Sequence, residues 1–159
     1  MSRLLAWVFI VVLASPSVFA EAGLRFLRHG REIGAWQRDQ LSARVPAQTL
    51  SVWEPHDGST ATYVGFPARA LFDRAYGPGW RTSDELLFTC LDGYQPSIPV
   101  ERFLKYDGLL AYGRNDAAPF SLTNQEQGGE TIDLGPYYLV WNNVKAPELR
   151  ATRRPPTTP

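Results

Sequence analysis

Cysteine is nearly absent from this sequence of 159 residues, which contains only Cys90. A single thiol excludes an internal disulfide framework, so the stability of the domain must come from its apolar core. Cys90 lies within the apolar run Leu86–Leu91, where a cysteine ordinarily behaves as a small buried hydrophobe. We therefore expect a buried thiol, and a metal-ligating or redox thiol is the alternative that the residues leave open.

Histidine and net charge are also scarce. His29 and His56 are the only histidines, and their spacing is not that of a chelating pair, so the sequence predicts no metal site. The 16 Lys and Arg residues balance 16 Asp and Glu residues, which argues against nucleic-acid binding. The chain also has no Gly-x-Ser-x-Gly nucleophile motif, no glycine-rich phosphate loop and no haem attachment motif.

Long apolar runs are missing except at the N-terminus. Arg3 precedes the uninterrupted apolar run Leu4–Ala14, and Val18-Phe19-Ala20 then places small residues before a cleavage point at Glu21. This pattern is typical of a secretory signal peptide. A run of 11 residues is shorter than the roughly 20 that span a bilayer, and a membrane anchor is the competing interpretation.

The same pattern sets the expected organisation of the chain. We predict a signal peptide at residues 1–20, one domain at residues 21–145 and a disordered tail at residues 146–159, which has almost no apolar content. The mature protein is then expected to be periplasmic or secreted, without a stable membrane span.

Residues 86–104 are expected to form the structural centre. The apolar run ends at Asp92-Gly93, a strong turn signal, and Pro96 and Pro99 then fix a second extended piece. Apolar residues at positions 100, 103 and 104 have helical spacing. The stretch predicts a strand, a turn at Asp92-Gly93-Tyr94, a short strand and one or two helical turns.

Hydrophobic periodicity predicts the remaining elements. A helix is expected after Pro67, and one helical turn at residues 41–45. Residues 113–135 are polar and rich in glycine, which predicts a long loop with a functional role. Strands are expected at residues 24–28, 48–53, 61–66, 109–112 and 137–141.

Aromatic residues gather near the predicted turns. They either line a ligand cleft or fill a β-rich core with their polar tips at its edge, and the second arrangement is the more common one. The set comprises Trp53, Tyr63, Trp80, Tyr94, Tyr112, Tyr137, Tyr138 and Trp141.

Taken in order, the motifs resemble the molybdopterin-binding domain of the sulfite oxidase family. The residues that carry the resemblance are Tyr63–Phe72, Leu86–Tyr94, Ser97–Glu101 and Gly108–Tyr112, within a match over roughly residues 45–141. In that family a helix start of the form G-hydrophobic-P-L-x-x-L-L precedes a strand ending in Asp-Gly-Tyr. The resemblance implies an α+β domain of mostly antiparallel or mixed β layers with short helices.

The sequence departs from that family at the metal ligand. Catalytic members ligate molybdenum through a cysteine at the end of the strand before the helix, and Trp53 or Glu54 stands at this place here. Cys90 lies in the later Asp-Gly-Tyr strand and is not the matching cysteine. No arginine-rich substrate pocket is visible in the sequence. The resemblance therefore implies a relative without the metal ligand and, by expectation, without bound cofactor, although molybdopterin is the cofactor that the family would take.

The expected function is that of a binding or accessory subunit beside a periplasmic redox protein. Candidate cofactor-binding residues are Trp53, Asp92, Gly93 and Tyr94, and residues 113–135 are a further candidate. For Asp92 the ordinary role is to cap its own turn, and for Arg69 it is to lie on a solvated helix face. Two alternatives stay open: an active molybdenum-dependent oxidoreductase that binds its metal through pterin contacts alone or through Cys90, and a structural periplasmic domain without a ligand.

The end of the chain differs from what the resemblance implies. In short exported proteins of this type, a segment like Pro136–Asn143 is followed by a final strand, whereas this chain continues to Arg153-Arg154-Pro155-Pro156. We hypothesise that the reading frame is shifted or truncated there.

Overall fold

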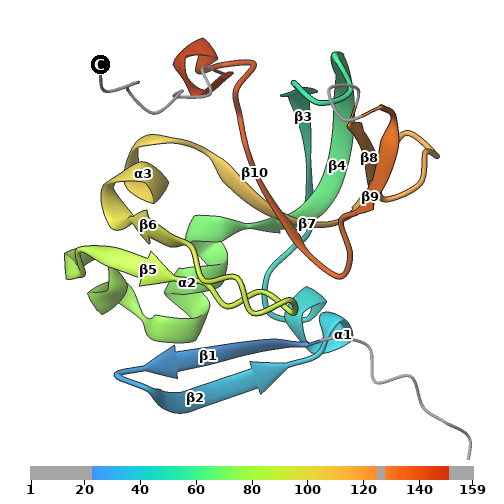
Figure 1. Ribbon diagram of the computed structural model, residues 1–159. Coiled ribbons are helices and arrows are strands. Elements are labelled where there is room, and N and C mark those ends of the chain that lie inside the picture. The colour runs from blue at the N-terminus through green and yellow to red at the C-terminus, as the bar shows by residue number, and fades with distance from the viewer. Residues whose placement is uncertain (1–22, 125–127, 151–159) are drawn as a thin grey trace, which may run out of the picture.

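A computed structural model describes residues 23–124 and 128–150 of the chain. The predicted signal peptide and most of the predicted tail lie outside these residues. No helix within the described ranges is long and apolar enough to cross a membrane. The fold is α+β, with antiparallel sheets and a few short helices, as the sequence predicted (Figure 1).

The centre of the fold is a four-stranded antiparallel sheet with the strand order β10-β7-β4-β3. Its strands are β3 (Gln48–Glu54), β4 (Ser59–Pro67), β7 (Gly108–Arg114) and β10 (Tyr138–Trp141). The strands that the sequence predicted at residues 48–53, 61–66, 109–112 and 137–141 are therefore confirmed. In β3 the alternating pattern of residues 48–53 holds because one side chain in two enters the core.

The sheet bends sharply where β4 meets β7. The register between the two strands shifts at Val64/Gly65, which is a β-bulge. A Cβ at Gly65 would lie 2.3 Å from the Leu110 carbonyl oxygen, so no other residue allows this close approach.

Asn143 joins the two edges of the curled sheet. Its side-chain Oδ1 accepts a hydrogen bond from the Trp53 N–H at 2.8 Å, and its Nδ2 donates to the Trp53 carbonyl at 2.7 Å. Trp53 belongs to β3 at one edge, whereas Asn143 follows β10 at the other. One buried amide thus takes the place of a neighbouring strand and holds the edges together.

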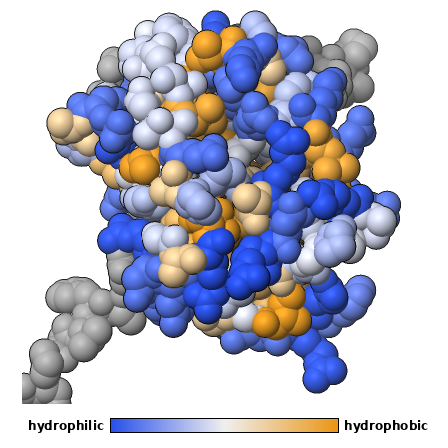
Figure 2. Space-filling model, turned by 180° about the vertical axis from the view of Figure 1, so that it is seen from behind, coloured by the Kyte–Doolittle hydropathy of each residue, from blue (hydrophilic) through white to orange (hydrophobic). Residues whose placement is uncertain are grey.

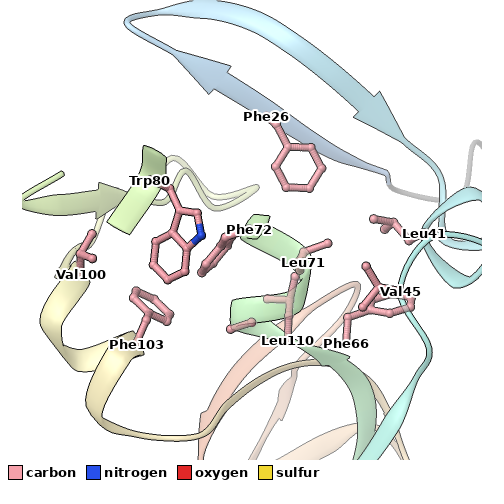
Figure 3. Close-up of a cluster of buried hydrophobic side chains, with 11 residues drawn as sticks. Phe26, Leu41, Val45, Phe66, Leu71, Phe72, Trp80, Val100, Phe103 and Leu110 are labelled. Carbon is pink, nitrogen blue, oxygen red and sulfur yellow. The ribbon is translucent and has the colours of Figure 1, made fainter. Parts of the chain in front are cut away.

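Each face of the sheet has its own apolar core. On one face, helices α2 (Ala68–Tyr76) and α3 (Val100–Lys105) and the 3₁₀ helix η1 (Pro78–Thr82) enclose an aromatic cluster, in which the Phe72 and Phe103 rings meet edge to face at 5.1 Å (Figure 3). The buried members are Phe26, Leu41, Val45, Phe66, Ala68, Leu71, Phe72, Trp80, Val100, Phe103 and Leu110. The second core comprises Val52, Ala61, Tyr63, Leu109, Ala111, Leu122, Leu134 and Val140.

An N-terminal hairpin covers the first core from outside the sheet. It consists of β1 (Leu24–Arg28) and β2 (Arg31–Trp36), and Phe26 reaches from it into the core (Figure 3). Helix α1 (Arg38–Ser42) follows. The helical turn was predicted at residues 41–45 and begins three residues earlier, because Gln37 and Gln40 form a capping box.

The strand, turn, short strand and helical turns predicted within residues 86–104 are present, but the prediction that this hairpin is the structural centre is wrong. Strands β5 (Glu85–Leu87) and β6 (Ser97–Pro99) form a separate two-stranded sheet at the periphery. Leu87 is 64% exposed and Leu91 is 83% exposed. A two-stranded sheet that packs on a core buries only one of its two faces. Here Leu86 and Phe88 pack against the core, so Leu87 between them faces solvent.

The prediction that Cys90 is buried is wrong for the same reason. Cys90 is exposed and lies in the hairpin turn, where its backbone N–H donates to the Tyr94 carbonyl at 2.8 Å. The apolar run predicted burial on both faces, but no second layer of the described chain covers this hairpin. Figure 2 shows one face of the molecule, on which small apolar patches are separated by hydrophilic residues.

Residues 113–135 are not a long loop. Strand β7 continues to Arg114, and β8 (Ser121–Asn124) pairs with β9 (Glu130–Asp133) as a hairpin. Leu122 is buried, so this hairpin covers the second core of the central sheet. The polar composition concealed it because β9 itself is exposed throughout.

We expect Asn143→Ala to lower the free energy of unfolding by about 1–3 kcal/mol, because the partly buried N–H and C=O of Trp53 lose their partner. Urea unfolding monitored by tryptophan fluorescence measures the change. The matched control is Asn142→Ala, which removes only the hydrogen bond that the Lys145 N–H donates to Asn142 Oδ1 at 3.1 Å. Equal stabilities of the two variants would show that the amide does not hold the edges together.

Candidate functional site

Trp53 lies at the edge of a shallow hollow between β3 and β10. The hollow has a volume of about 160 Å³ and is lined by residues 52–55, residues 138–141, Asn143, Leu149 and Arg150. The Arg150 guanidinium lies 6.0 Å from the centre of the Trp53 ring, and its Nε donates to the Asn143 carbonyl at 2.8 Å. The hollow therefore presents an indole and a guanidinium, held by the same residue that joins the sheet edges.

Glu54, one of the residues that line this hollow, carries a buried carboxyl. Glu54 is only 2% exposed, although it carries an ionisable group, and the Tyr63 hydroxyl donates to its Oε1 at 2.8 Å. Strand β3 turns Glu54 inward because it follows Leu50 and Val52 at a spacing of two residues. Tyr63 is itself fully buried and lies on the adjoining strand β4.

Burial raises the pKa of Glu54 above its ordinary value, because the charged form loses water. The Tyr63 hydrogen bond acts in the opposite direction, and the nearby Asp57 adds to the rise, while His56 and Arg114 lower it. Burial likewise raises the pKa of Tyr63 and of Tyr138. The end of β3 therefore holds a carboxyl that keeps its proton at higher pH than an exposed one.

Arg114 organises the charged groups beside this carboxyl. Its Nε and Nη2 donate to the two carboxylate oxygens of Asp116 at 2.9 and 2.7 Å, and its Nη1 lies 3.8 Å from Asp57 Oδ2. The bond from Arg114 lowers the pKa of Asp116 to about 2. Asp57 Oδ1 also accepts from the Thr123 N–H at 2.6 Å, which ties the β3–β4 turn to β8. Both acids are thus engaged in structural bonds.

A second hollow of about 280 Å³ lies at the other end of β3. It is lined by residues 48–50, Pro67, Arg69 and residues 107–109. Arg69 Nη2 and Asp107 Oδ1 form an ion pair at 2.5 Å, and both side chains are about half exposed. The expectation that Arg69 lies on a solvated helix face agrees with this exposure.

Asp92, Gly93 and Tyr94 form a self-contained turn at the tip of the β5–β6 hairpin. Asp92 Oδ1 accepts from the Tyr94 N–H at 3.0 Å, so Asp92 caps its own turn. Gly93 has a φ of 85°, in the left-handed region that glycine adopts readily. Tyr94 is 65% exposed, and neither hollow is lined by these three residues.

The structure does not bring the four predicted cofactor-binding residues together. Figure 1 shows the chain between β5 and β6 reaching towards α1, whereas β3 ends at the far side of the molecule. Only Trp53 lies in a hollow. Within the described ranges, no three His, Cys, Asp or Glu side chains are grouped so that they could hold a metal ion.

The sequence interpretation missed the groups that gather near Trp53. Glu54 had a usable signal, because a carboxyl at the inward position of an alternating strand is an exception to the pattern. Nothing in the sequence indicated that Arg114, which bonds the nearby Asp116, also lies beside Asp57 in a distant turn. Asn143 had no signal either, since its side chain bonds backbone groups.

A family model described as "Oxidoreductase molybdopterin binding domain" matches residues 36–126, which is more than half of the chain. The matched residues run from the end of β2 past β8 and include both Trp53 and the Asp92-Gly93-Tyr94 turn. No curated protein matches the chain.

The raised pKa of Glu54 makes stability depend on pH. The folded state holds this proton more tightly than the unfolded state, whose carboxyl has an ordinary value of 4.5, so the wild type loses stability as pH rises from there through the raised pKa. We expect Glu54→Gln to lack this loss, so its stability relative to the wild type rises between about pH 4 and 8. Urea unfolding across this range measures it.

Glu85→Gln is the control, since it removes an exposed carboxyl from β5. The interpretation is wrong if the stability difference between Glu54→Gln and the wild type is the same at every pH.

Proposed function

Because this chain belongs to the oxidoreductase molybdopterin binding domain family, we propose that it is a non-catalytic member of that family, a binding or accessory subunit of a periplasmic redox system. The periplasmic part of the proposal rests on the signal-peptide pattern of residues 1–20. A redox protein of the same compartment is the expected partner.

The observation that carries the proposal is that the Glu54 carboxyl is buried and hydrogen-bonded. By the resemblance, a catalytic member has its molybdenum-ligating cysteine at the end of the strand that corresponds to β3, where this chain has Trp53 and Glu54. Glu54 is buried and already bonded to Tyr63, and it presents oxygen rather than sulfur. A soft thiolate ligand is therefore replaced by a hard carboxyl that is engaged in the core.

The remaining residues do not fit the molybdopterin group either. Drug-sized ligands generally occupy pockets of about 300–1,000 Å³, and the hollows here measure about 160 and 280 Å³. A pterin phosphate calls for cations, but Arg69 is paired with Asp107 and Arg114 with Asp116. Arg150 alone among these guanidiniums has no carboxylate partner in the described ranges, and it lines the smaller hollow.

The chain's single thiol supports the competing proposal of an active oxidoreductase. Cys90 is exposed and so is open to a metal or a redox partner. It lies in the β5–β6 hairpin, away from both hollows, with no second thiol in the chain. A ligand set built on Cys90 would thus use a different part of the fold from the end of β3.

The test is the molybdenum and pterin content of the protein purified from the exported fraction of its native host. We expect less than one tenth of an equivalent of either, in a sample that is folded by circular dichroism. Near-stoichiometric metal would overturn the proposal. Recovery of the protein only from the cytoplasm would overturn its periplasmic part.

Cys90→Ser serves as the matched variant, because it changes one exposed sulfur to oxygen. The proposal predicts the same metal content and the same stability as the wild type, to within about 0.5 kcal/mol. If the wild type carries molybdenum and Cys90→Ser loses it, the competing oxidoreductase is supported. The alternative of a purely structural domain makes one further prediction, that no redox protein of the exported fraction binds saturably to this protein.

A further inference from the structure

Strand β3 is an edge strand without the usual protection against pairing. It is seven residues long and forms one end of the four-stranded sheet. Natural edge strands carry lysine, proline or a bulge that blocks another strand, but residues 48–53 contain neither charge nor proline and pair with β4 in an unbroken register. This edge is therefore able to accept a further strand.

The hydrogen bonds around β3 show which backbone groups face outward. Ser51 lies opposite Thr62, and the Thr62 N–H and C=O are both used on the side of β7, by Asp116 at 3.4 Å and by Asn115 at 2.7 Å. Ser51 and Thr62 are thus a pair without mutual backbone bonds, and the contact of their hydroxyls at 3.1 Å agrees with the short spacing of such pairs. The Ser51 N–H and C=O consequently point away from the sheet.

In an antiparallel strand, every second residue directs its backbone N–H and C=O to the same side. The outward backbone groups of β3 therefore belong to Thr49, Ser51 and Trp53. Those of Trp53 are bonded to Asn143, as described above. For the Thr49 and Ser51 backbone no hydrogen bond is found on this side within the described ranges, and both residues are exposed. Two N–H and two C=O groups are therefore presented to an incoming strand.

We propose that a second copy of this chain pairs with β3 through its own β3. The two strands run antiparallel about a two-fold axis at Leu50. Each Thr49 exchanges two backbone hydrogen bonds with Ser51 of the other copy, which gives four bonds in all. This register leaves Trp53 with Asn143, whereas a register centred on Ser51 would place Trp53 opposite Thr49 and compete with that amide.

The side chains of the strand suit a two-fold pairing. A two-fold axis brings a residue against its own copy, so a charge at the centre would repel itself. Here Leu50 meets Leu50, and Gln48 lies opposite Val52, so no charged residue is opposed. The chain's own residues 151–159 suit the edge less well, because three of the nine are prolines, which lack the N–H that a ladder requires.

The first test compares sedimentation equilibrium of the wild type and Ser51→Pro over a wide range of protein concentration. The wild type is expected to show a monomer–dimer equilibrium. Proline removes the outward N–H of each copy, two bonds per dimer, and should weaken association at least about tenfold. Ser51→Ala is the control, since it loses the Thr62 hydroxyl contact but keeps the N–H.

A second test locates the axis and does not depend on proline being tolerated. In a Cys90→Ser background, Leu50→Cys places two thiols on the axis in a pair without mutual backbone bonds, whose Cα atoms are about 4.5 Å apart and within disulfide range. Mild oxidation should give a covalent dimer. The control, Thr60→Cys, puts an exposed thiol on β4 and should stay monomeric.

Three results would overturn the proposal: a wild type that is monomeric at all concentrations, a dimer that Ser51→Pro leaves unchanged while it remains folded, or Leu50→Cys that cross-links no better than Thr60→Cys. A dimer that persists in Ser51→Pro and is lost in Leu91→Ser would assign the contact to the exposed β5–β6 hairpin instead.

Discussion

The two hydrogen bonds between Asn143 and the Trp53 backbone are the constraint on which the arrangement of the ends of β3 and β10 depends. They connect the ends of β3 and β10, the two edge strands of the four-stranded sheet. The Asn143 side chain is buried and both bonds are partly buried, so water competes with them less than it does at the surface. The hollow at Trp53 and the position of Arg150 both follow from this connection.

The polar groups next to this connection contact one another in sequence, from the buried Glu54 to the exposed Asp116. Tyr63 satisfies Glu54, the Arg114 guanidinium lies 5.9 Å from the centre of the Tyr63 ring, and Asp116 holds Arg114 through two bonds. In this family member a polar network of oxygen and nitrogen groups thus occupies the end of β3, where the resemblance implies a thiolate in catalytic relatives. The arrangement stabilises the fold and leaves the site without a soft metal ligand.

The sequence predicted those parts of the fold that depend on local periodicity. Strands β3 and β4 were predictable because each alternates over a half-buried face, and Asp92-Gly93 marked its turn because both residues have local turn chemistry. The position of the β5–β6 hairpin was not predictable, since an apolar run does not reveal whether one face or two are covered. The β8–β9 hairpin was hidden because its buried apolar residue, Leu122, is surrounded by polar residues, of which Asn124 is buried as well.

The candidate site was less predictable for a physical reason. Asn143 acts on a backbone 90 residues away, and backbone atoms leave no trace in the choice of side chains. The alternation of β3 was enough to predict that the Glu54 carboxyl points inward, but its partner Tyr63 was only one aromatic residue among several in the sequence. Of the four predicted cofactor-binding residues, Trp53 alone lies beside the buried groups, because its strand and the Asp-Gly-Tyr turn belong to different sheets.

Strand β7 belongs to both apolar cores at once. Leu110 faces the aromatic cluster, while its neighbours Leu109 and Ala111 face the second core. Neither core can therefore melt without exposing a strand that the other one needs. Although helices and hairpins are distributed over both faces of the sheet, the domain is built to unfold in a single cooperative step rather than one half at a time.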